Sequence, residues 1–291
     1  MAFGNFDGVH LGHQALLAAL RQLADNLGGL AIVVTLHPHP LLLLRPDRAP
    51  QAVDSLDGRL AQLAHFGVNA TLVLPFDAAL AARSAHWFAE TVLFDGLSAG
   101  ALVTGHDTRF GHGGAGDGQL LHQLAQPRGI TVVGCAPVLW QDEVVSSSRV
   151  RKTVAAGDVA TAAALLGRPW ALQGQVVHGD HRGRTIGFAT ANIAAPDQVM
   201  PAHGVYAGWL LRDGHPPLQA VTNVGVRPTF GGQHVQVEAH CLDFEGDLYD
   251  QTVRLQFVAR LRDEQRFAGK DALVAQIAND VLAARQILAH G

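Results

Sequence analysis

Cysteine is nearly absent from this chain, because only Cys135 and Cys241 occur, in different halves and without a Cys-x-x-Cys motif. This spacing argues against both a disulfide framework and a cysteine zinc site. Long apolar runs are missing too. The leucine run 41–44 is ended by Arg45 and Pro46 and is far shorter than a membrane span. The sequence therefore predicts neither a disulfide-rich module nor a membrane protein.

Clusters of basic residues are also missing. The chain has 21 Lys and Arg against 25 Asp and Glu, a net charge of −4, and no basic run, which argues against nucleic acid as the main partner. The first residues lack the basic start and apolar middle of a signal peptide, so we expect a cytoplasmic protein with no membrane and no obligatory protein partner. Small anionic ligands need only local positive charge, and this composition permits them.

The length of the chain and its apolar content predict an α/β protein. With 291 residues, 48% of them hydrophobic, and 32 glycines, the chain can form two domains with separate cores. Short apolar runs alternate with helical patterns, the runs at 30–36, 70–75, 101–104 and 130–134 and the helices at 56–66, 85–97 and 118–126. This alternation predicts a doubly wound parallel sheet, with strands covered on both faces and ligands at their carboxyl ends.

The stretch 3–17 joins a first strand to a helix, and it places His10 and His13 beside Gly12 at the start of that helix. Backbone N–H groups at a helix N-terminus bind phosphate. Two imidazoles can donate hydrogen bonds to the charge that grows when a phosphoanhydride is attacked. The alternative interpretation is that the two histidines only close the helix.

Three polar segments follow later strands or extended stretches. They are 37–40, 105–111 and 146–151, and the last is rich in serine and arginine. Taken singly, each could be only a turn, a loop or a helix N-cap. Because the carboxyl ends of parallel strands share one edge of a sheet, their joint position predicts one site together with the histidines.

The pattern His-x-Gly-His after a first strand resembles nucleotidyltransferases that transfer an adenylyl group from ATP. The longer Gly-Asn-Phe-Asp-Gly-Val-His-x-Gly-His resembles, more narrowly, the bacterial bifunctional riboflavin kinase/FMN adenylyltransferase family, and the three polar segments resemble that family in the same order. Thr108 and Ser148 stand where the family usually has Phe and Thr. The resemblance implies an FMN adenylyltransferase domain over 1–167, in which His10 and His13 are catalytic. Its ATP- and FMN-binding residues would be Gly4, Asn5, Phe6, Asp7, Gly8, Gly12, His39, Gly105, Asp107, Ser146, Ser147, Ser148 and Arg151.

Beyond a boundary near residue 168, the apolar period changes to two. The runs 235–241 and 253–257 alternate apolar and polar residues, and Asp213-Gly214 is typical of a hairpin tip. Consecutive strands without intervening helices predict an antiparallel β-barrel, closed by an amphipathic C-terminal helix at about 271–289.

Glu238 falls on the polar face of the predicted strand 235–241, together with Gln236 and His240. A carboxylate in such a place can orient a primary alcohol and accept its proton in a kinase reaction. The alternative is a solvated glutamate on a strand.

The second half resembles the riboflavin kinase part of the same family. It has a glycine-rich basic loop at 179–184, then Gly-Phe-Ala-Thr-Ala-Asn at 187–192, where the family usually has Pro in place of Ala189. The resemblance implies a riboflavin kinase domain over 168–291 with Glu238 as catalytic base. Thr190 and Asn192 would hold Mg²⁺ and the ATP phosphates. Further ATP- or flavin-binding residues would be Gly179, Arg182, Gly183, Gly187, Arg227, Arg262, Glu264 and Phe267.

The resemblance covers nearly the whole chain and implies a bifunctional enzyme of flavin cofactor biosynthesis. The barrel would phosphorylate riboflavin to FMN, also when expressed alone, and the N-terminal domain would adenylate FMN to FAD and release pyrophosphate. ATP, riboflavin and FMN are the implied substrates, and Mg²⁺ is the implied cofactor. Two alternatives stay open, a protein with one active half and a flavin-binding regulatory protein without turnover.

The first predicted strand is unusually short. Met1, Ala2 and Phe3 precede Gly4, whereas the resemblance implies a longer apolar strand before that glycine. We therefore expect that the natural coding frame starts upstream and that an extended version would have a more stable N-terminal domain and faster FAD synthesis.

Overall fold

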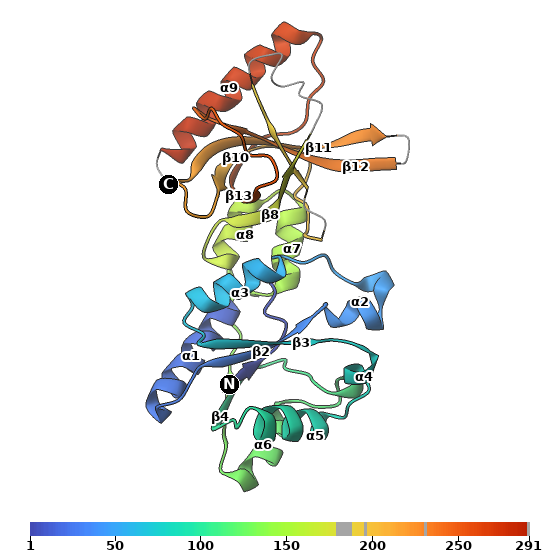
Figure 1. The fold of residues 1–291 in the computed structure, drawn as a ribbon, viewed down its shortest axis with the longest axis vertical. Helices are drawn as coiled ribbons and strands as arrows, with labels where there is room; N and C mark the ends of the chain where they lie inside the picture. Colours follow the sequence, from blue (N-terminus) through green and yellow to red (C-terminus); the bar gives the residue numbers. More distant parts are fainter. Residues whose placement is uncertain (179–187, 195–196, 230–231, 290–291) are drawn as a thin grey trace. The chain divides into compact units, whose positions relative to one another are not determined.

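The computed structural model describes residues 1–178, 188–194, 197–229 and 232–289 (Figure 1). The chain divides into two compact units by packing. The first unit comprises Met1–Gln51 and Leu56–Ser147, and the second comprises Ala52–Ser55 and Ser148–Gly291. Over the described ranges, no helix has both the length and the apolar character needed to cross a membrane.

The first unit is built on a five-stranded parallel sheet of order β3-β2-β1-β4-β5. The central strand β1 (Ala2–Phe3) pairs on one side with β2 (Ile32–His37) and on the other with β4 (Ala101–Gly105). The edge strands are β3 (Ala70–Pro75) and β5 (Thr131–Cys135). The predicted parallel sheet is confirmed, and its strands lie within two residues of the predicted ranges.

Helices cover both faces of this sheet (Figure 1). Ala2 and Val33 face the helices α1 (Leu11–Leu27) and α3 (Leu56–His65), while Phe3 and Val34 face α5 (Ala85–Trp87), the π-helix η2 (Phe88–Gly96) and α6 (Gly118–Ala125). Neighbouring strand residues point to opposite faces, so each central strand contributes to two cores. The doubly wound arrangement is thus confirmed.

One detail of the predicted burial was wrong. The edge strands β3 and β5, predicted to be covered on both faces, are partly exposed along their length, because each has a neighbour on one side only. Leu16 and Leu20 of α1 are buried, whereas Leu27, the last residue of that helix, is 60% exposed. Shorter elements complete the unit: α2 (Pro40–Leu44), η1 (Pro46–Arg48), α4 (Ala78–Ala81), η3 (His112–Gly114), η4 (Gln126–Arg128), β6 (Leu139–Trp140) and β7 (Glu143–Val144).

The second unit contains a closed antiparallel barrel of order β10-β11-β12-β9-β8-β13, as predicted. Its strands are β8 (Trp170–Val177), β9 (Ala191–Ala194), β10 (Gly204–Leu211), β11 (Leu218–Thr229), β12 (Gly232–Cys241) and β13 (Thr252–Arg262). β10 and β13 approach closely at Gly208, where a Cβ would lie 1.8 Å from the carbonyl oxygen of Gln256. Only glycine fits this close approach.

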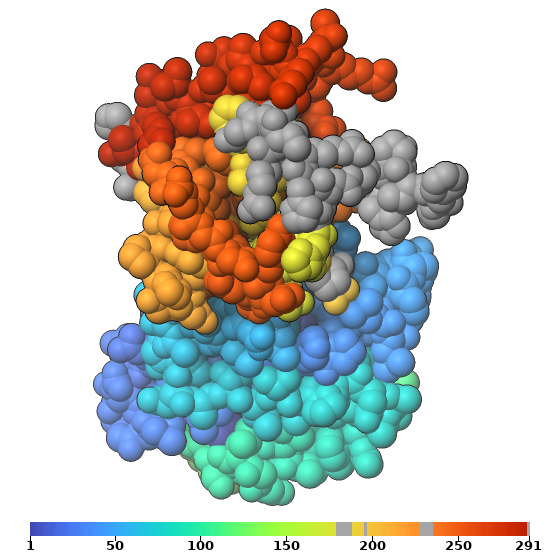
Figure 2. All heavy atoms as spheres, turned by 45° about the horizontal axis from the view of Figure 1, so that its top comes forward, coloured from blue at the N-terminus to red at the C-terminus, as the bar shows by residue number. Residues whose placement is uncertain are grey.

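The C-terminal helix α9 (Lys270–Leu288) lies along the outside of the barrel, as the red spheres in Figure 2 show. Ala284 and Leu288 of α9 pack on Val205, Ala207 and Val221 of the barrel strands. This contact buries an apolar stripe of the helix and confirms the predicted closing helix.

The second unit also includes α7 (Ser147–Ala155), apart from its first residue, and α8 (Val159–Leu166). It further includes the distant segment 52–55, whose Ala52 N–H donates to Asp197 O and whose Ala52 O accepts from Val199 N–H. The predicted functional boundary at residue 168 falls between α8 and β8, and it stays a prediction.

Candidate active sites

The loop between β1 and α1 has a strained backbone. Phe6 and Val9 have φ angles of 48° and 38°, a region that side chains other than glycine seldom adopt. Such strain persists only where surrounding contacts hold the chain, and it is concentrated at functional sites. The loop that carries the predicted phosphate-binding residues is therefore held in one shape by its neighbours.

The contacts that hold this loop end on its backbone carbonyls. The Asn5 carbonyl accepts from Arg59 Nη1 at 2.6 Å and from Thr35 Oγ1 at 3.2 Å. Ser147 Oγ donates to the Asp7 carbonyl at 2.8 Å. Three side chains from separate elements thus fix the backbone just before α1. Arg59, 7% exposed on α3, was not identified from the sequence, because nothing local marks its approach to the loop.

His10 and His13 lie together at the start of α1. Their rings stack with centroids 3.7 Å apart and an interplanar angle of 20°. The backbone N–H of His13 donates to His10 Nδ1 at 3.4 Å, so the side chain of His10 caps the helix through Nδ1. A neutral ring that accepts at Nδ1 carries its proton at Nε2, which makes His10 Nε2–H a donor. A side chain at Gly12 would crowd the His10 ring, since its Cβ would lie 3.2 Å away.

The environment of His13 keeps its imidazole neutral. Burial, then electrostatic repulsion from His10 when that ring is protonated and from Arg59, hold the pKa of His13 well below its usual range. Its Nδ1 is buried and has no hydrogen-bond partner among the described residues. A buried polar atom without a partner requires an explanation, and a bound ligand supplies one.

Asn5 and His39, both predicted for this site, are in contact. His39 Nδ1 accepts from the Leu41 N–H at 3.2 Å, so a neutral His39 carries its proton at Nε2. Asn5 Nδ2 lies 3.3 Å from that Nε2. Two donors cannot bond to each other, so with this tautomer of His39 the contact is a hydrogen bond only if the oxygen and nitrogen of the Asn5 amide are exchanged.

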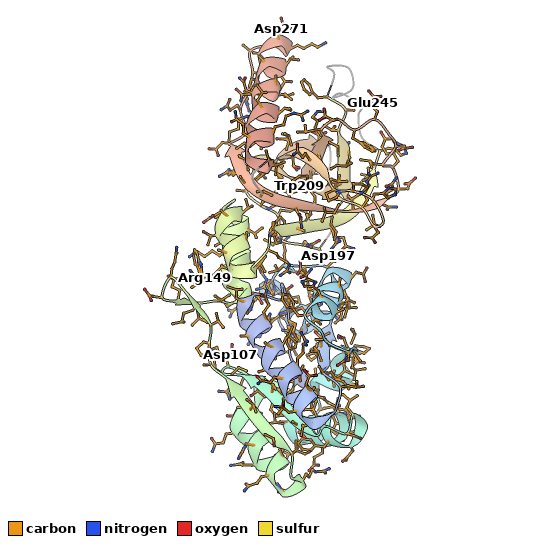
Figure 3. All side chains as sticks on the ribbon, turned by 90° about the vertical axis from the view of Figure 1, so that its left-hand side faces the viewer. Asp107, Arg149, Asp197, Trp209, Glu245 and Asp271 are labelled. Atoms are coloured by element: carbon orange, nitrogen blue, oxygen red, sulfur yellow. The ribbon has the colours of Figure 1, made fainter. Side chains whose placement is uncertain are left out.

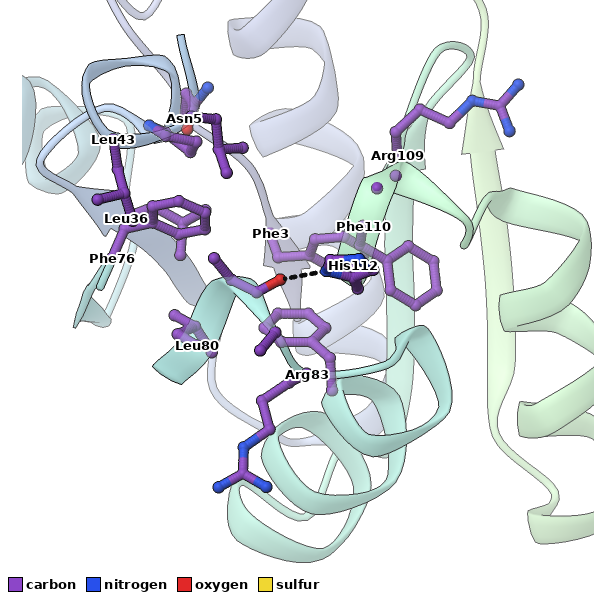
Figure 4. A pocket seen from close by; sticks show the side chains of 18 of the residues that line it. Phe3, Asn5, Leu36, Leu43, Phe76, Leu80, Arg83, Arg109, Phe110 and His112 are labelled. Atoms are coloured by element: carbon purple, nitrogen blue, oxygen red, sulfur yellow. Dashed lines mark hydrogen bonds between the residues drawn. The ribbon is translucent and has the colours of Figure 1, made fainter. Parts of the chain in front are cut away.

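A cavity of about 650 Å³ opens beside these residues (Figure 4). Its walls include the rings of Phe3, Phe76 and Phe110, with Leu36 and Asn5 at the carboxyl ends of central strands. The large apolar wall with few polar groups is typical of a site for a small organic ligand. None of these rings was identified as a site residue from the sequence, although Phe76 directly follows a predicted strand and Phe110 lies in the predicted 105–111 loop.

The rim of this cavity carries charged and polar residues. Figure 4 shows the guanidinium groups of Arg83 and Arg109 directed away from the cavity. The His112 Nδ1–H donates to the Ala81 carbonyl at 3.0 Å, which ties the loop after β4 to α4. The ring of His112 is thereby fixed beside the cavity.

The other predicted residues of this site have different surroundings. Gly105 is the last residue of β4, and Asp107 lies two residues further along the chain (Figure 3). The Asp107 side chain is 83% exposed, and its Oδ1 lies 3.9 Å from His106 Nδ1. Ser146 directly precedes α7. Ser148 and Arg151 lie on α7 and belong to the second unit, so their part in the nucleotide site stays a prediction.

In the barrel, the strand register brings Glu238 of β12 opposite Asn192 of β9 and Asn223 of β11. Gln236 Nε2 donates to Asn192 Oδ1 at 2.7 Å and to Glu238 Oε1 at 3.1 Å. Glu238 is half-buried, and Asn192 is 9% exposed. The predicted base and a predicted metal ligand therefore lie in one polar cluster. Gln236, which contacts both, was assigned no role from the sequence.

Other residues of the predicted kinase site are partly described. Thr190 is half-buried, and the carbonyl of the neighbouring Ala189 accepts from His240 Nδ1 at 2.8 Å.

Arg262 pairs with the buried Asp280 of α9, with Nη2 2.8 Å from Oδ2. Glu264 is exposed. Phe267 lies with its ring centroid 5.7 Å from the Arg262 guanidinium. Gly179, Arg182, Gly183, Gly187 and the side chain of Arg227 lie outside what the structure describes.

Comparison with known proteins matches both halves of the chain. A family model described as FAD synthetase matches residues 1–149, and one described as riboflavin kinase matches residues 166–288. The bifunctional riboflavin kinase/FMN adenylyltransferase of Escherichia coli K12 is 41% identical over 98% of this chain and 91% of its own. The protein of that name from Bacillus subtilis is 34% identical over 96% and 89%. A solved structure described as a macrolide-efflux protein from Streptococcus pneumoniae superposes with a TM-score of 0.88 at 31% identity, over 98% of this chain and 93% of that chain.

Proposed function

The chain belongs to the family of bifunctional riboflavin kinase/FMN adenylyltransferases, and we propose that its two units divide the two reactions between them. The barrel phosphorylates riboflavin to FMN. The parallel-sheet unit transfers an adenylyl group from ATP to FMN, giving FAD and pyrophosphate. The observation that carries this proposal is that one family match lies almost wholly on the first unit and the other on the second, each unit having its own polar cluster.

In the parallel-sheet unit, the cavity between Phe3, Phe76 and Phe110 suits the flavin ring of FMN. The phosphates of ATP then bind at the start of α1 beside His10 and His13. An FMN phosphate oxygen attacks the α-phosphorus of ATP, and the bond from that phosphorus to the β-phosphate bridge oxygen breaks as pyrophosphate leaves. Imidazole N–H groups at this point stabilise the negative charge that grows in the transition state.

In the barrel, Glu238 orients the primary hydroxyl of riboflavin and accepts its proton as the oxygen attacks the γ-phosphorus of ATP. The bond from that phosphorus to the β–γ bridge oxygen breaks, and ADP leaves. The hydroxyl of Thr190 and the amide oxygen of Asn192 are hard oxygen donors of the kind that Mg²⁺ accepts together with water and phosphate. Bound there, Mg²⁺ would neutralise charge on the ATP phosphates. Within the described residues, no group of three or more His, Cys, Asp or Glu could hold a metal.

The proposal is tested by incubating the protein with riboflavin, ATP and Mg²⁺ and separating the flavins by chromatography. Appearance of FMN followed by FAD supports the two reactions. FMN alone, or FAD from supplied FMN alone, would mean that one half is inactive. Quenching of riboflavin fluorescence without either product would favour a regulatory flavin-binding protein.

Location and partners follow from the sequence rather than from the fold. We propose a cytoplasmic enzyme that works on riboflavin, FMN and ATP. The expected lack of nucleic-acid, membrane and obligatory protein partners stays a prediction.

A further inference from the structure

One amide group joins the proposed base to the proposed metal ligand. The NH₂ group of Gln236 lies 3.1 Å from Glu238 Oε1 and 2.7 Å from Asn192 Oδ1, and both distances are within hydrogen-bond range. The three side chains belong to two paired strands, since Asn192 of β9 is opposite Glu238 in the register. Gln236 precedes Glu238 by two residues on β12, and this spacing places both on one face of the strand.

The charge of Glu238 decides how both amides are turned. An ionised carboxylate only accepts hydrogen bonds, so Gln236 must present nitrogen rather than oxygen to Glu238. The same nitrogen faces Asn192, which must therefore present its oxygen. An amide oxygen has two lone pairs, so Asn192 Oδ1 can accept this bond and still act as an oxygen ligand.

We propose that Gln236 is a positioning residue for riboflavin phosphorylation, which holds the Glu238 carboxylate and the Asn192 amide oxygen in place through its NH₂ group. This inference rests on the roles proposed above for Glu238 and Asn192. Gln236 itself touches neither substrate nor the reacting atoms in this account. Its effect passes through the two neighbours, and a packing role for its side chain makes different predictions.

Two substitutions separate hydrogen bonding from packing. Gln236→Met keeps the length of the side chain but removes the donor, and we expect the kcat of FMN formation to fall by about tenfold or more. Gln236→Glu keeps the shape but places oxygen against two oxygens, so we expect a fall at least as large. A Gln236→Glu enzyme with normal kcat would show that no donor is needed at residue 236 and would overturn the proposal. Normal kcat in Gln236→Met would do the same.

Controls within the same chain distinguish misfolding from loss of position. Gln256→Met on β13 is the matched control, because the described structure gives this side chain no hydrogen bond, and it should keep the wild-type rate. FAD synthesis from supplied FMN should stay normal in every variant. The Kd of riboflavin, measured by fluorescence quenching, should change less than about twofold in Gln236→Met, since a positioning residue acts on kcat. A loss of riboflavin affinity that accounts for the whole rate effect would overturn the proposal.

Combination with Glu238→Gln shows whether the effect passes through Glu238. If it does, Gln236→Met should reduce kcat by a much smaller factor in the Glu238→Gln enzyme than in the wild type. An equal factor in both backgrounds would overturn the proposal. A Glu238→Gln enzyme with normal kcat would instead remove the proposed base, so the two failures are distinguishable.

Calorimetric titration with ADP, with and without Mg²⁺, tests the Asn192 part without turnover. Gln236→Met should show a smaller gain in ADP affinity on addition of Mg²⁺ than the wild type. An unchanged gain would overturn the role of Gln236 toward Asn192.

Discussion

The indole N–H of Trp170 donates a hydrogen bond to the backbone carbonyl of Val53 at 3.0 Å, within the core of the barrel unit. Both residues are almost completely buried, at 1% and 0% exposure. Gln198 Nε2 donates to the same carbonyl at 3.1 Å, and Arg168 Nη2 lies 3.0 Å from Asp54 Oδ2. The segment 52–55 is therefore part of the barrel core, although more than a hundred residues separate it from Trp170 in sequence.

This relationship bears on the fragment 168–291, which the sequence predicts to make FMN by itself. Without residues 52–55, the fragment loses the buried side chain of Val53 and leaves Trp170 Nε1 without this acceptor. Burial of one valine contributes about 1.5–3 kcal/mol and a hydrogen bond about 1 kcal/mol. We expect the fragment to make FMN but to unfold at a lower temperature than the barrel in the full chain. Calorimetry checks this expectation, and equal unfolding temperatures would contradict it.

The proposed base is tested by Glu238→Gln, which keeps the size of the side chain and removes its basicity. The kcat for FMN formation should fall by about a hundredfold or more, with the KM for ATP near the wild-type value, because Glu238 acts on the riboflavin hydroxyl. Steady-state kinetics with FMN detection measures the effect. FAD formation from supplied FMN should be unchanged, and phosphorylation at the normal rate would remove Glu238 from the mechanism.

The proposed adenylyl site is tested by replacing His10 and His13 together with alanine. The variant should accumulate FMN from riboflavin and form no detectable FAD, because both imidazole donors are lost from the start of α1. Chromatography of the reaction mixture measures both products. If kinase activity also disappears while circular dichroism shows an intact fold, the assignment of the two reactions to separate units is wrong.

Local sequence patterns were sufficient for most of the fold. Apolar runs and helical periodicity predicted β3 to the residue and α3 to within one residue, and the change to period two predicted the barrel. In the first site, the motif around His10 and His13 was sufficient to predict that both residues lie at the start of the first helix. These features depend on neighbours close in sequence, which periodicity and motifs report directly.

Contacts between distant segments could not be predicted in the same way. No local pattern marks 52–55 as part of a barrel, and nothing beside Arg59 indicates that its guanidinium reaches the Asn5 carbonyl. Convergence of Phe76 and Phe110 on one cavity depends on the order of the strands, which the sequence left open. The Gln236 bonds likewise depend on the register between β9 and β12.

The buried imidazole of His13 predicts a pH dependence of stability. Burial, then His10 and Arg59, lower the pKa of His13 in the folded protein, whereas the unfolded chain takes up a proton near pH 6.5. The contribution of neutral His13 to the free energy of unfolding is complete above that pH. It is lost as the pH falls toward the folded-state pKa of His13, by at most about 1.4 kcal/mol per pH unit. His13→Gln should therefore show a shallower loss of unfolding free energy between about pH 7 and 5. Denaturant titrations across this range measure both slopes, and identical slopes would contradict the prediction.

Arg59 should matter to the adenylyl site although it lies behind the loop. Its Nη1 lies 2.6 Å from the Asn5 carbonyl and 3.3 Å from Thr35 Oγ1, and its charge contributes to the lowered pKa of His13. Arg59→Met keeps an apolar stem and removes both the donor and the charge. Small displacements of positioning contacts reduce rates strongly, so we expect the kcat of FAD formation to fall by about tenfold or more while FMN formation stays normal.

Arg59→Lys separates the two effects, because it keeps the charge but not the planar donor group. It should retain the pH dependence attributed to His13, whereas Arg59→Met should flatten that dependence only slightly, since burial and then His10, the larger causes of the lowered pKa of His13, remain. Arg128→Met is the matched control, because Arg128 is exposed and its guanidinium pairs with Asp95 at 2.7 Å. Normal FAD synthesis in Arg59→Met, with wild-type pH dependence, would show that the strained loop and His13 keep their properties without this buried cation.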